Sequence, residues 1–307
     1  MGLIQRRLRY LLDSDYRWLV NSYHGHYKDM PDEEYLKKKY RIRTGRIPDF
    51  DNPTRFTEKL QWIKLYDHNP LYTTLVDKYN VKKYVADTLG EEYVIPLLGH
   101  WDNVEDIDFD SLPDRFVMKA SHDSFGLIIC KDKSKLDIEK AKKKLKKCLN
   151  TEYFYSSREW PYKNVKPCIL AEKFMEDKAD GELRDYKFFC FNGVPRVVYI
   201  TQGRATGDNR QTYADFFDMD YNHLDMKIDH EHAPIPPHKP VNFELMQELA
   251  AKLSAGIPQV RADFYEVDGR VYFGEMTFFH GGGFANFTPD SCDELWGSWI
   301  KLPEKNI

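Results

Sequence analysis

Hydrophobic side chains recur along the chain with two spacings, and each spacing predicts a different kind of element. Residues 78–90 carry their apolar side chains on one helical face and end on a glycine, as amphipathic helices commonly do. Residues 138–149 and 243–256 repeat this pattern, and most of residues 1–70 is also predicted to be helical, with Thr57 as the N-cap of one helix. Short apolar runs predict strands at 91–101, 115–120, 126–132, 168–175, 185–201 and 260–279.

The order of these elements predicts an α+β protein of two lobes with a cleft between them. We expect a helical extension over residues 1–70, a first lobe over residues 71–175 and a second lobe over residues 176–307. Asn192 and Gly193 lie between two apolar runs and predict a tight hairpin turn in the second lobe.

The last predicted hairpin, VRADFYEVDGRVYFGEMTFFHGGGF at residues 260–284, has charged side chains in strands that are otherwise apolar. A two-residue loop at Asp268-Gly269 would put the carboxylates of Asp263 and Glu275 on opposite faces, because side chains alternate along a strand. We prefer a three-residue loop that begins one residue earlier and has a bulge at Gly269, because it puts both carboxylates on one face. The polar side chains on that face are Arg261, Asp263, Glu275 and Thr277.

Two carboxylates in a partly dry site repel each other unless a cation lies between them. Oxygen ligands of this kind suit Mg²⁺, which keeps several waters and commonly bridges protein carboxylates to phosphates. Arg261 would then face the negative charge of whatever the metal holds. An internal salt-bridge network of Arg261, Asp263 and Glu275 explains the same residues, and the hairpin alone leaves both interpretations open.

Charge and composition narrow the class of protein. The 307 residues carry a net charge of −4, which provides no general attraction to nucleic acid, and the lysines of residues 138–149 are expected to form a solvated helix face. Residues 1–20 lack the long apolar region of a secretory signal and predict an amphipathic helix, which leaves peripheral membrane association open. Five widely spaced cysteines without a Cys-x-x-Cys pair argue against a disulfide framework and a zinc site, and favour the cytoplasm.

The sequence also contains cations and a short polar loop of the kind that holds phosphate groups. Lys119 ends an apolar strand and is followed by residues 121–126, whose backbone N–H groups can fold over phosphates as a hairpin loop. The loop is not a Walker motif. Lys78 begins a predicted helix, and the run ILAEKFM closes a predicted buried strand where its backbone could meet an adenine ring. Other charged residues that the strands present are Asp185, Lys187 and Arg204.

Taken in order, these segments resemble the ATP-grasp superfamily and, within it, the TupA-like ATP-grasp family of polysaccharide-biosynthesis proteins. The resemblance is carried by RFTEKLQWIKLYDHNPLYTTLVDKYNVKKYV, FVMKASHDSFG, AEKFM, DYKFFCFNG and RADFYEVDGRVYFGEMTF, and it spans roughly residues 35–300. It implies an ATP-grasp fold, in which two lobes hold ATP between antiparallel sheets, and it implies ATP and Mg²⁺ as cofactors.

The resemblance also implies where the nucleotide lies. Lys78 and Lys119 are similar to the two lysines that reach the phosphates in that superfamily. Glu172 resembles the acid at the adenine amine, Lys173 to Met175 resemble the backbone and floor around adenine, and Asp185 resembles a ribose contact. The nucleotide contacts implied in this way are Lys78, Lys119, Ser124, Glu172, Lys173, Phe174, Met175, Asp185, Lys187 and Arg204.

By the same resemblance, Asp263 and Glu275 look like the two magnesium carboxylates, and Arg261 resembles the arginine that stabilises an acyl-phosphate. Lys187 is expected to assist it as a second catalytic cation. Two departures stand out: the phosphate loop SHDSFG is poor in glycine, and Thr277 stands where many members have an asparagine that binds the metal.

The resemblance implies an ATP-dependent carboxylate–amine ligase, whose carboxylate belongs to a uronic-acid sugar and whose amine comes from an amino acid or small amine. The glycines after His280 would let backbone N–H groups approach the reacting carboxylate. The general base stays open, with His122, His230 and His280 as candidates. Aromatic residues along 152–162 either stack on sugar rings or pack in the core.

Other functions stay open at this point, as does the oligomeric state. A sugar kinase would use the same ATP site with a hydroxyl acceptor, and a protein that binds nucleotide without turnover would explain the altered loop. A glycosyltransferase would need a metal motif such as Asp-x-Asp, and Asp218-Met219-Asp220 matches it. That motif lies in residues 201–240, a stretch predicted to be rich in loops, where a solvated turn explains it better.

Overall fold

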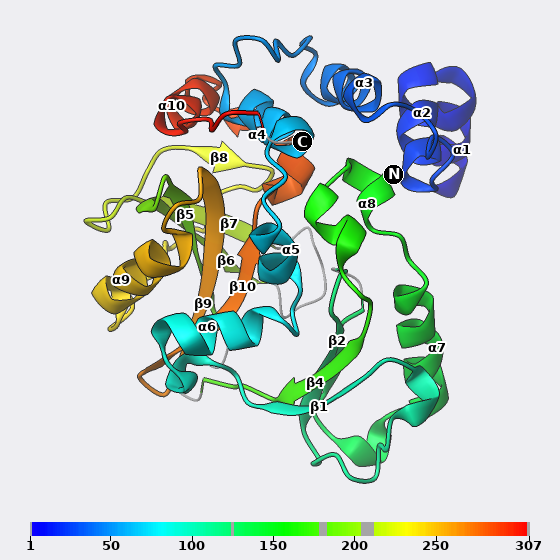
Figure 1. Ribbon diagram of the computed structural model, residues 1–307, viewed down its shortest axis with the longest axis vertical. Coiled ribbons are helices and arrows are strands. Elements are labelled where there is room, and N and C mark those ends of the chain that lie inside the picture. The colour runs from blue at the N-terminus through cyan, green and yellow to red at the C-terminus, as the bar shows by residue number, and fades with distance from the viewer. Residues whose placement is uncertain (1, 124–125, 178–182, 204–211, 306–307) are drawn as a thin grey trace.

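The computed structural model describes residues 2–123, 126–177, 183–203 and 212–305, and the strands in these ranges form antiparallel sheets (Figure 1). The strands are β1 (Leu97–Trp101), β2 (Phe116–Ala120), β3 (Ile128–Cys130), β4 (Ile169–Lys173), β5 (Asp185–Phe191), β6 (Val194–Gln202), β7 (Tyr213–Phe217), β8 (Lys227–Ile228), β9 (Gln259–Val267), β10 (Arg270–Thr277) and β11 (Phe287–Thr288). One sheet has the order β1-β4-β2-β3 and another has the order β10-β9-β5-β6-β7, while β8 pairs with β11.

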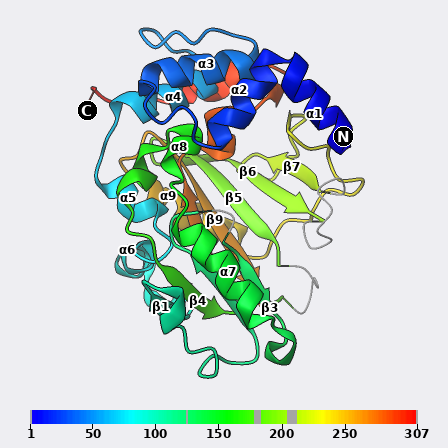
Figure 2. The same ribbon diagram turned by 90° about the vertical axis from the view of Figure 1, so that its right-hand side faces the viewer.

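Helices cover the sheets and form the N-terminal part of the chain. They are α1 (Leu3–Leu12), α2 (Ser14–Tyr23), α3 (Asp32–Thr44), α4 (Phe56–Tyr66), α5 (Leu71–Val76), α6 (Val81–Leu89), α7 (Ile138–Leu149), α8 (Phe154–Ser157), α9 (Phe243–Ser254) and α10 (Ser291–Trp299). Figure 2 shows α7 lying along the four-stranded sheet, with α1 to α4 across one end of the molecule. In α9, Phe243 packs against Phe188 of the five-stranded sheet.

Two separate hydrophobic cores explain the division into lobes. The smaller core lies between the four-stranded sheet and α7, where Phe116, Met118 and Leu145 are buried. The larger core joins the five-stranded sheet to α4, α9 and α10. The predicted α+β class is therefore confirmed. The lobe boundaries themselves stay a prediction, although the expected division near residue 175 falls between β4 and β5.

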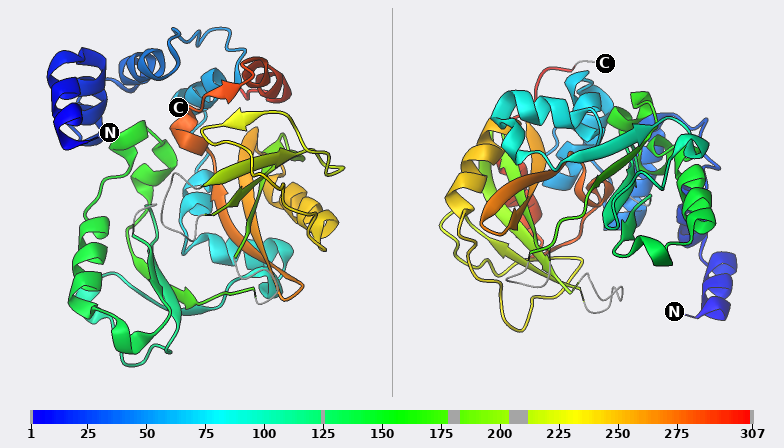
Figure 3. Two further views of the ribbon diagram at one scale, coloured as in Figure 1. Left: turned by 180° about the vertical axis from the view of Figure 1, so that it is seen from behind. Right: turned by 90° about the horizontal axis from the view of Figure 1, so that it is seen from below.

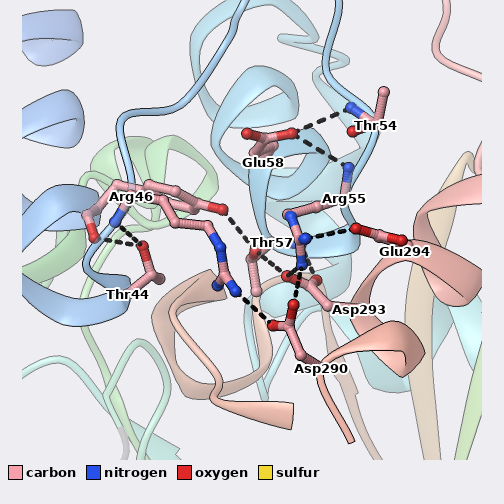
Figure 4. A network of polar contacts seen from close by, with 10 residues as sticks. Thr44, Arg46, Thr54, Arg55, Thr57, Glu58, Asp290, Asp293 and Glu294 are labelled. Carbon is pink, nitrogen blue, oxygen red and sulfur yellow. Dashed lines mark hydrogen bonds and ion pairs between the residues drawn. The ribbon is translucent and has the colours of Figure 1, made fainter.

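A polar network joins the N-terminal helices to the C-terminal helix α10 (Figure 4). Arg55 contacts Asp290 at 3.0 Å and Glu294 at 2.5 Å. Sequence predicts Thr57 as the cap of α4, but the N-cap is Arg55, two residues earlier, and Thr57 instead donates from its N–H and hydroxyl to Asp293 at 2.9 and 2.8 Å. The cap prediction is therefore wrong. The polar groups of Thr57 find their partner in the distant helix α10, which the local sequence does not reveal.

The β9–β10 hairpin turns through two residues, so the predicted three-residue loop is wrong. Val267 pairs with Arg270 across Asp268 and Gly269, which have φ of 48° and 74°, as a tight primed turn requires. The register then shifts at Gly274, where a Cβ atom would lie 3.1 Å from the Asp263 carbonyl oxygen. This bulge sits in β10 rather than in the turn.

The bulge at Gly274 puts the same side chains on one face of the sheet as the predicted bulge at Gly269 would have done. Beyond it, Glu275 pairs with Asp263 and Thr277 pairs with Arg261. Residues that pair across a sheet share a face, and residues two apart along a strand also share it. The four polar side chains of the hairpin therefore do lie on one face.

Other elements depart less from expectation. The turn at Asn192 and Gly193 is confirmed, since Phe191 pairs with Val194 across it. Within residues 201–240, expected to be mainly loop, the structure contains the strands β7 and β8, while residues 204–211 lie outside the described part. The YADFF run of β7 is too short for its period to be recognised from the sequence.

The N-terminal helix α1 lies at the edge of the molecule, as Figure 3 shows from two sides. Its apolar side chains Ile4, Leu8, Leu11 and Leu12 are exposed. Within the described ranges, none of the helices is long and apolar enough to cross a bilayer. Attachment of this helix to a membrane surface stays a prediction.

Candidate active site

One face of the five-stranded sheet changes from aromatic to charged along its strands. Near one end Phe189 packs against Phe56 of α4 and Trp296 of α10. Two residues earlier on β5, Lys187 lies directly opposite Asp263 of β9. The aromatic half fixes the helices on the sheet, and the charged half lies beyond these aromatic contacts, with Lys187 and Asp263 both buried.

Arg261 is the centre of this charged surface. Its Nε and Nη2 atoms donate to the two carboxylate oxygens of Asp263, both at 2.7 Å, in a bidentate pair. Nη2 also lies 3.1 Å from Oε1 of Glu275 and 3.0 Å from the hydroxyl of Thr277. Its third nitrogen, Nη1, lies 2.7 Å from Nδ1 of His280. The guanidinium therefore orients Asp263, Glu275 and Thr277 of the hairpin and also contacts His280.

Lys187 adds a second cation beside the same carboxylate. Its Nζ atom donates to Oδ2 of Asp263 at 3.0 Å and lies 3.1 Å from Oδ2 of Asp185. Asp263 is 1% exposed and has two cations as partners, whereas 41% of the Glu275 side chain is accessible. Of the two predicted metal carboxylates, Glu275 is the one that is open to an incoming ligand.

Charge decides the ionisation of these groups. Burial acts to raise the pKa of Glu275, but Lys78, Arg261 and Lys187 outweigh burial and hold that pKa below its usual value. Burial acts to lower the pKa of Arg261, yet the carboxylates of Asp263 and Glu275 raise it further above its usual value. Both groups are therefore charged at neutral pH.

Lys78 approaches the hairpin from a segment that lies far from it in the sequence. It lies just before α6, its N–H donates to the Ser121 carbonyl at 3.0 Å, and its Nζ donates to the Asp123 carbonyl at 2.8 Å. Burial lowers the pKa of Lys78, and Lys119 lowers it further, while Glu275 acts to raise it. One small cavity is lined by Leu75, Val76, Lys78, Val81, Tyr162, Gly274, Glu275 and Met276.

Glu172 belongs to β4 of the four-stranded sheet, and its carboxylate lies between two lysines. Its Oε2 is 2.6 Å from Nζ of Lys119, and its Oε1 is 2.5 Å from Nζ of Lys82, a residue that the sequence did not single out. Burial acts to raise the pKa of Glu172, but the two lysines outweigh it and lower that pKa. Two cations against one anion leave this cluster with an excess positive charge.

The start of the predicted phosphate loop is buried and fixed. Ser121, His122 and Asp123 are at most 3% exposed, and Asp123 accepts from the Gly126 N–H at 2.8 Å. A Cβ atom on Gly126 would lie 2.9 Å from the Cβ of Ala120, so this position requires glycine. Ser124 and Arg204, both predicted nucleotide contacts, lie outside the described residues.

The predicted adenine segment follows β4. The N–H of Lys173 donates to the Pro96 carbonyl at 3.0 Å, so it is engaged within the protein. Phe174 lies beside Arg115, whose guanidinium carbon is 4.3 Å from the ring centroid. Phe174 and Met175 are half-buried, and their role at an adenine ring stays a prediction.

The sequence matches the TupA-like ATPgrasp family over residues 58–301. The chain belongs to this family. The match covers the cavity, the four-stranded sheet and the whole charged hairpin, and the ATP-grasp fold expected from the sequence is thereby confirmed. No curated protein matches the sequence.

Several solved ATP-dependent ligases are similar to this ATP-grasp chain at low identity. The D-alanine–D-alanine ligase of Bacillus anthracis is 15% identical over 72% of this chain and 58% of its own, with a TM-score of 0.36. The Helicobacter pylori D-alanine–D-alanine ligase is 13% identical over 81% of this chain and 70% of its own, with a TM-score of 0.40. The first alignment spans less than two thirds of that ligase, and such distant likenesses transfer no substrate or partner.

The donor set of the ATP-grasp hairpin suits Mg²⁺. Asp263, Glu275 and Thr277 offer only oxygen atoms, which are the ligands that Mg²⁺ prefers. Thr277 donates to Oε1 of Glu275 at 3.2 Å, so its hydroxyl already orients one of these carboxylates. Arg261 and Lys187 already pair with the oxygens of Asp263, so Mg²⁺ binding there would replace some of these contacts.

The three candidate histidines are placed differently, and His230 follows β8, where its N–H donates to the Ile228 carbonyl at 2.7 Å. His122 lies 3.1 Å from the Thr151 carbonyl, which gives it a structural partner away from the hairpin. His280 contacts Arg261, which has no acceptor, so its Nδ1 must accept and its proton resides on Nε2. Burial first, and then Arg261, keep the pKa of His280 well below its usual value. His280 is therefore a neutral anchor for Arg261.

The glycines after His280 pack against the N-terminal helix α4. Gln61 donates to the Gly283 carbonyl at 2.6 Å, and Lys64 donates to the Gly282 carbonyl at 2.6 Å. Gly283 has a φ of 74°, and a Cβ atom there would lie 2.5 Å from Nε2 of Gln61. A Cβ on Gly281, by contrast, would meet nothing within 4 Å. The loop is thus fixed on one side and open on the other.

The sequence did not single out Gln61, Lys64 or Lys82. A signal existed for the first two, because Thr57, Gln61 and Lys64 recur at helical spacing on an otherwise apolar helix. Lys82 follows Lys78 by four residues, a spacing that suggests joint action.

Proposed function

We propose that this chain is an ATP-dependent carboxylate–amine ligase. The observation that carries the proposal is the cavity lined by both Lys78 and Glu275. Lys78 is an expected phosphate contact and Glu275 an expected magnesium ligand, and they come from distant parts of the chain. The membership of the ATP-grasp family supports the same assignment.

The proposed reaction has two steps. An oxygen of the substrate carboxylate attacks the γ-phosphorus of ATP, the bond from that phosphorus to the β–γ bridging oxygen breaks, and ADP leaves. The amine nitrogen then attacks the carbonyl carbon of the acyl-phosphate, inorganic phosphate leaves, and the nitrogen loses a proton. Phosphoryl transfer needs positioning and charge neutralisation more than covalent help from the protein.

Each charged group has a proposed task in this scheme. Lys78 and Lys119 hold phosphate oxygens, and the excess positive charge around Glu172 favours a polyanion there. Arg261 stays charged and stabilises the acyl-phosphate, with Lys187 beside it. Asp263 and Glu275 would hold Mg²⁺, which when bound supplies further charge neutralisation at the transferring phosphate.

We further propose a uronic-acid sugar as the carboxylate and an amino acid or small amine as its partner, within capsular or cell-wall polysaccharide biosynthesis in the cytoplasm. The resemblance to polysaccharide-biosynthesis proteins supports this choice. Within the aromatic stretch at 152–162, Phe154 and Trp160 are buried in the core, and Tyr162 lines the cavity. Tyr162 is therefore the aromatic side chain best placed to meet a sugar ring.

The glycosyltransferase alternative loses its motif, because the carboxylate of Asp218 accepts from the N–H groups of Asp220 and Asn222 at 3.0 and 2.7 Å. Those contacts stabilise a turn.

The test of the ligase proposal is phosphate release from ATP and Mg²⁺ across a panel of uronic acids and amines, followed by mass spectrometry. We expect an amide product with one ADP and one phosphate. A phosphorylated sugar without free phosphate would contradict the proposal and indicate a kinase.

A further inference from the structure

A second group of ligand-type side chains lies away from the candidate active site. Asp215 belongs to β7, where its neighbour Phe216 pairs with Tyr199, and Tyr199 in turn pairs with Lys187. Phe216 therefore shares the sheet face of the charged hairpin. Because side chains alternate along a strand, Asp215 points to the opposite face of the sheet.

Two histidines converge on this carboxylate. Nε2 of His223 lies 2.8 Å from Oδ1 of Asp215, and Nδ1 of His232 lies 3.3 Å from the same oxygen. One ligand atom from each of the three residues falls within 4.8 Å of the others. Neighbouring ligands of a four-coordinate metal lie roughly 3.4 Å apart when metal–ligand bonds are about 2.1 Å. The three side chains are therefore spaced for one ion.

The cluster carries polar groups that protein contacts leave unsatisfied. Asp215 is 0% exposed, and among the described residues it forms no ion pair with a lysine or arginine; besides the histidines, its carboxylate accepts from the Ala233 N–H at 3.3 Å. Within the same part of the chain, the two ring nitrogens of His232 are buried and have no hydrogen-bond partner. A buried carboxylate and buried imidazole nitrogens are costly unless a partner compensates them. A metal ion would satisfy both at once.

Backbone contacts hold the ligands in position from both sides. Asp218 and Asn222 close the turn after β7, with the Asp218 N–H donating to the Asn222 carbonyl at 3.0 Å, and His223 then bridges back to Phe217. On the other side, the Ala214 N–H donates to the Glu231 carbonyl at 2.9 Å. These bonds fix the residue that precedes each of the three side chains.

We infer that Asp215, His223 and His232 bind one divalent transition-metal ion of the Zn²⁺ type. Two imidazoles and one carboxylate suit Zn²⁺ or Co²⁺, whereas Mg²⁺ prefers oxygen ligands. The cysteine pattern argued against a zinc site, and this cluster uses none of the cysteines. The ion would fasten the segment from residue 218 to residue 233 to the edge strand β7, and three protein ligands leave a fourth position for water.

The test is metal binding by the full chain without a histidine tag. Protein stripped with a chelator is titrated with Co²⁺, whose visible absorption reports its coordination, and bound Co²⁺ is then displaced with Zn²⁺. We expect one Co²⁺ per chain, displaced by Zn²⁺ and unaffected by excess Mg²⁺. No stoichiometric binding by the unaltered protein would overturn the inference, and the cluster would then be an internal ion pair.

Variants locate the ion. His223→Ala and His232→Ala are expected to weaken Co²⁺ binding by at least roughly 10-fold. His238→Ala is the matched control, because this nearby histidine is exposed and lies outside the cluster. Zn²⁺ should raise the Tm of the control but not of the other two variants. Equal Co²⁺ affinity in all three variants would overturn the site. The readout does not depend on the proposed ligase activity.

Discussion

Two clusters of arginine and carboxylate side chains use the same chemistry in different surroundings. In the network between α4 and α10 (Figure 4), the side chains of Asp290 and Glu294 are 51% and 59% exposed. Around Arg261, in contrast, Asp263 is 1% exposed and accepts from two cations. Water can replace a lost partner in the first cluster but not in the second. Only the second cluster also has a carboxylate, Glu275, that opens into a cavity.

The largest difference in the rate of phosphate release is expected when one negative charge is removed from each cluster in turn. Asp263→Asn should lower the rate of ATP-dependent phosphate release by about 10²–10³-fold, because it removes a buried electrostatic stabiliser. Asp290→Asn should leave the rate within about 2-fold, because its pair is exposed and adds little. Both rates are measured with saturating Mg²⁺ and ATP. Equal losses would show that the two clusters do not differ in function.

The second comparison concerns nucleotide affinity and two lysines, Lys119 of β2 and Lys83 of α6. Lys119→Met leaves Glu172 with Lys82 alone and removes an expected phosphate contact, so the affinity for an ATP analogue should fall by roughly 10-fold or more. Lys83→Met is the control, since Lys83 pairs with Asp87 at the surface. Calorimetric titration with Mg²⁺ and the analogue measures both. An unchanged affinity in Lys119→Met would remove this residue from the site.

The third comparison concerns the free energy of unfolding of variants at Lys64 and Lys37. Lys64 is buried and donates to three oxygens, on Gln61, Ser157 and Gly282, at 2.6–2.9 Å. Lys64→Met should lower the free energy of unfolding by about 1–3 kcal/mol, because the buried acceptors lose their donor. Lys37→Met, which breaks a surface pair with Glu33, should cost less than about 0.5 kcal/mol. Urea unfolding distinguishes them, and similar costs would contradict the assignment of Lys64 as an anchor.

The smallest expected effect is a pH dependence. Burial and Arg261 depress the pKa of His280 in the folded state, so below pH of about 6.5 the unfolded chain takes up a proton that the folded chain does not. Stability is therefore lost as pH falls through that value. His280→Asn keeps an acceptor for Arg261 and should reduce this loss by on the order of 1 kcal/mol near pH 5.5. Parallel stability curves for the two proteins would contradict this account.

Most of the fold could be predicted from the sequence because its patterns are local. The helix α7 and the turn at Asn192 and Gly193 follow from hydrophobic spacing and turn chemistry, and both are confirmed. The role of Thr57 could not be predicted, because the carboxylate that accepts from its N–H and hydroxyl belongs to Asp293 of α10. The strand β7 was missed because five residues in a polar stretch show too little periodicity.

The candidate site was predictable as a set of residue types but not as a geometry. The shared face of Asp263 and Glu275 depends on a bulge at Gly274, and the sequence suggested a bulge at Gly269 instead. A one-residue shift at either glycine puts Glu275 on the same face of the sheet, because side chains alternate along a strand. Lys82 and Lys64 escaped notice because their partners come from other elements, and only the folded chain brings these partners together.

The most direct test of the central claim is a crystal structure with Mg²⁺ and a non-hydrolysable ATP analogue. We expect Mg²⁺ bound by Asp263 and Glu275, with the terminal phosphate beside Lys78 and Lys119. It would be contradicted if Asp263 kept only Arg261 and Lys187 as partners while the nucleotide lay elsewhere.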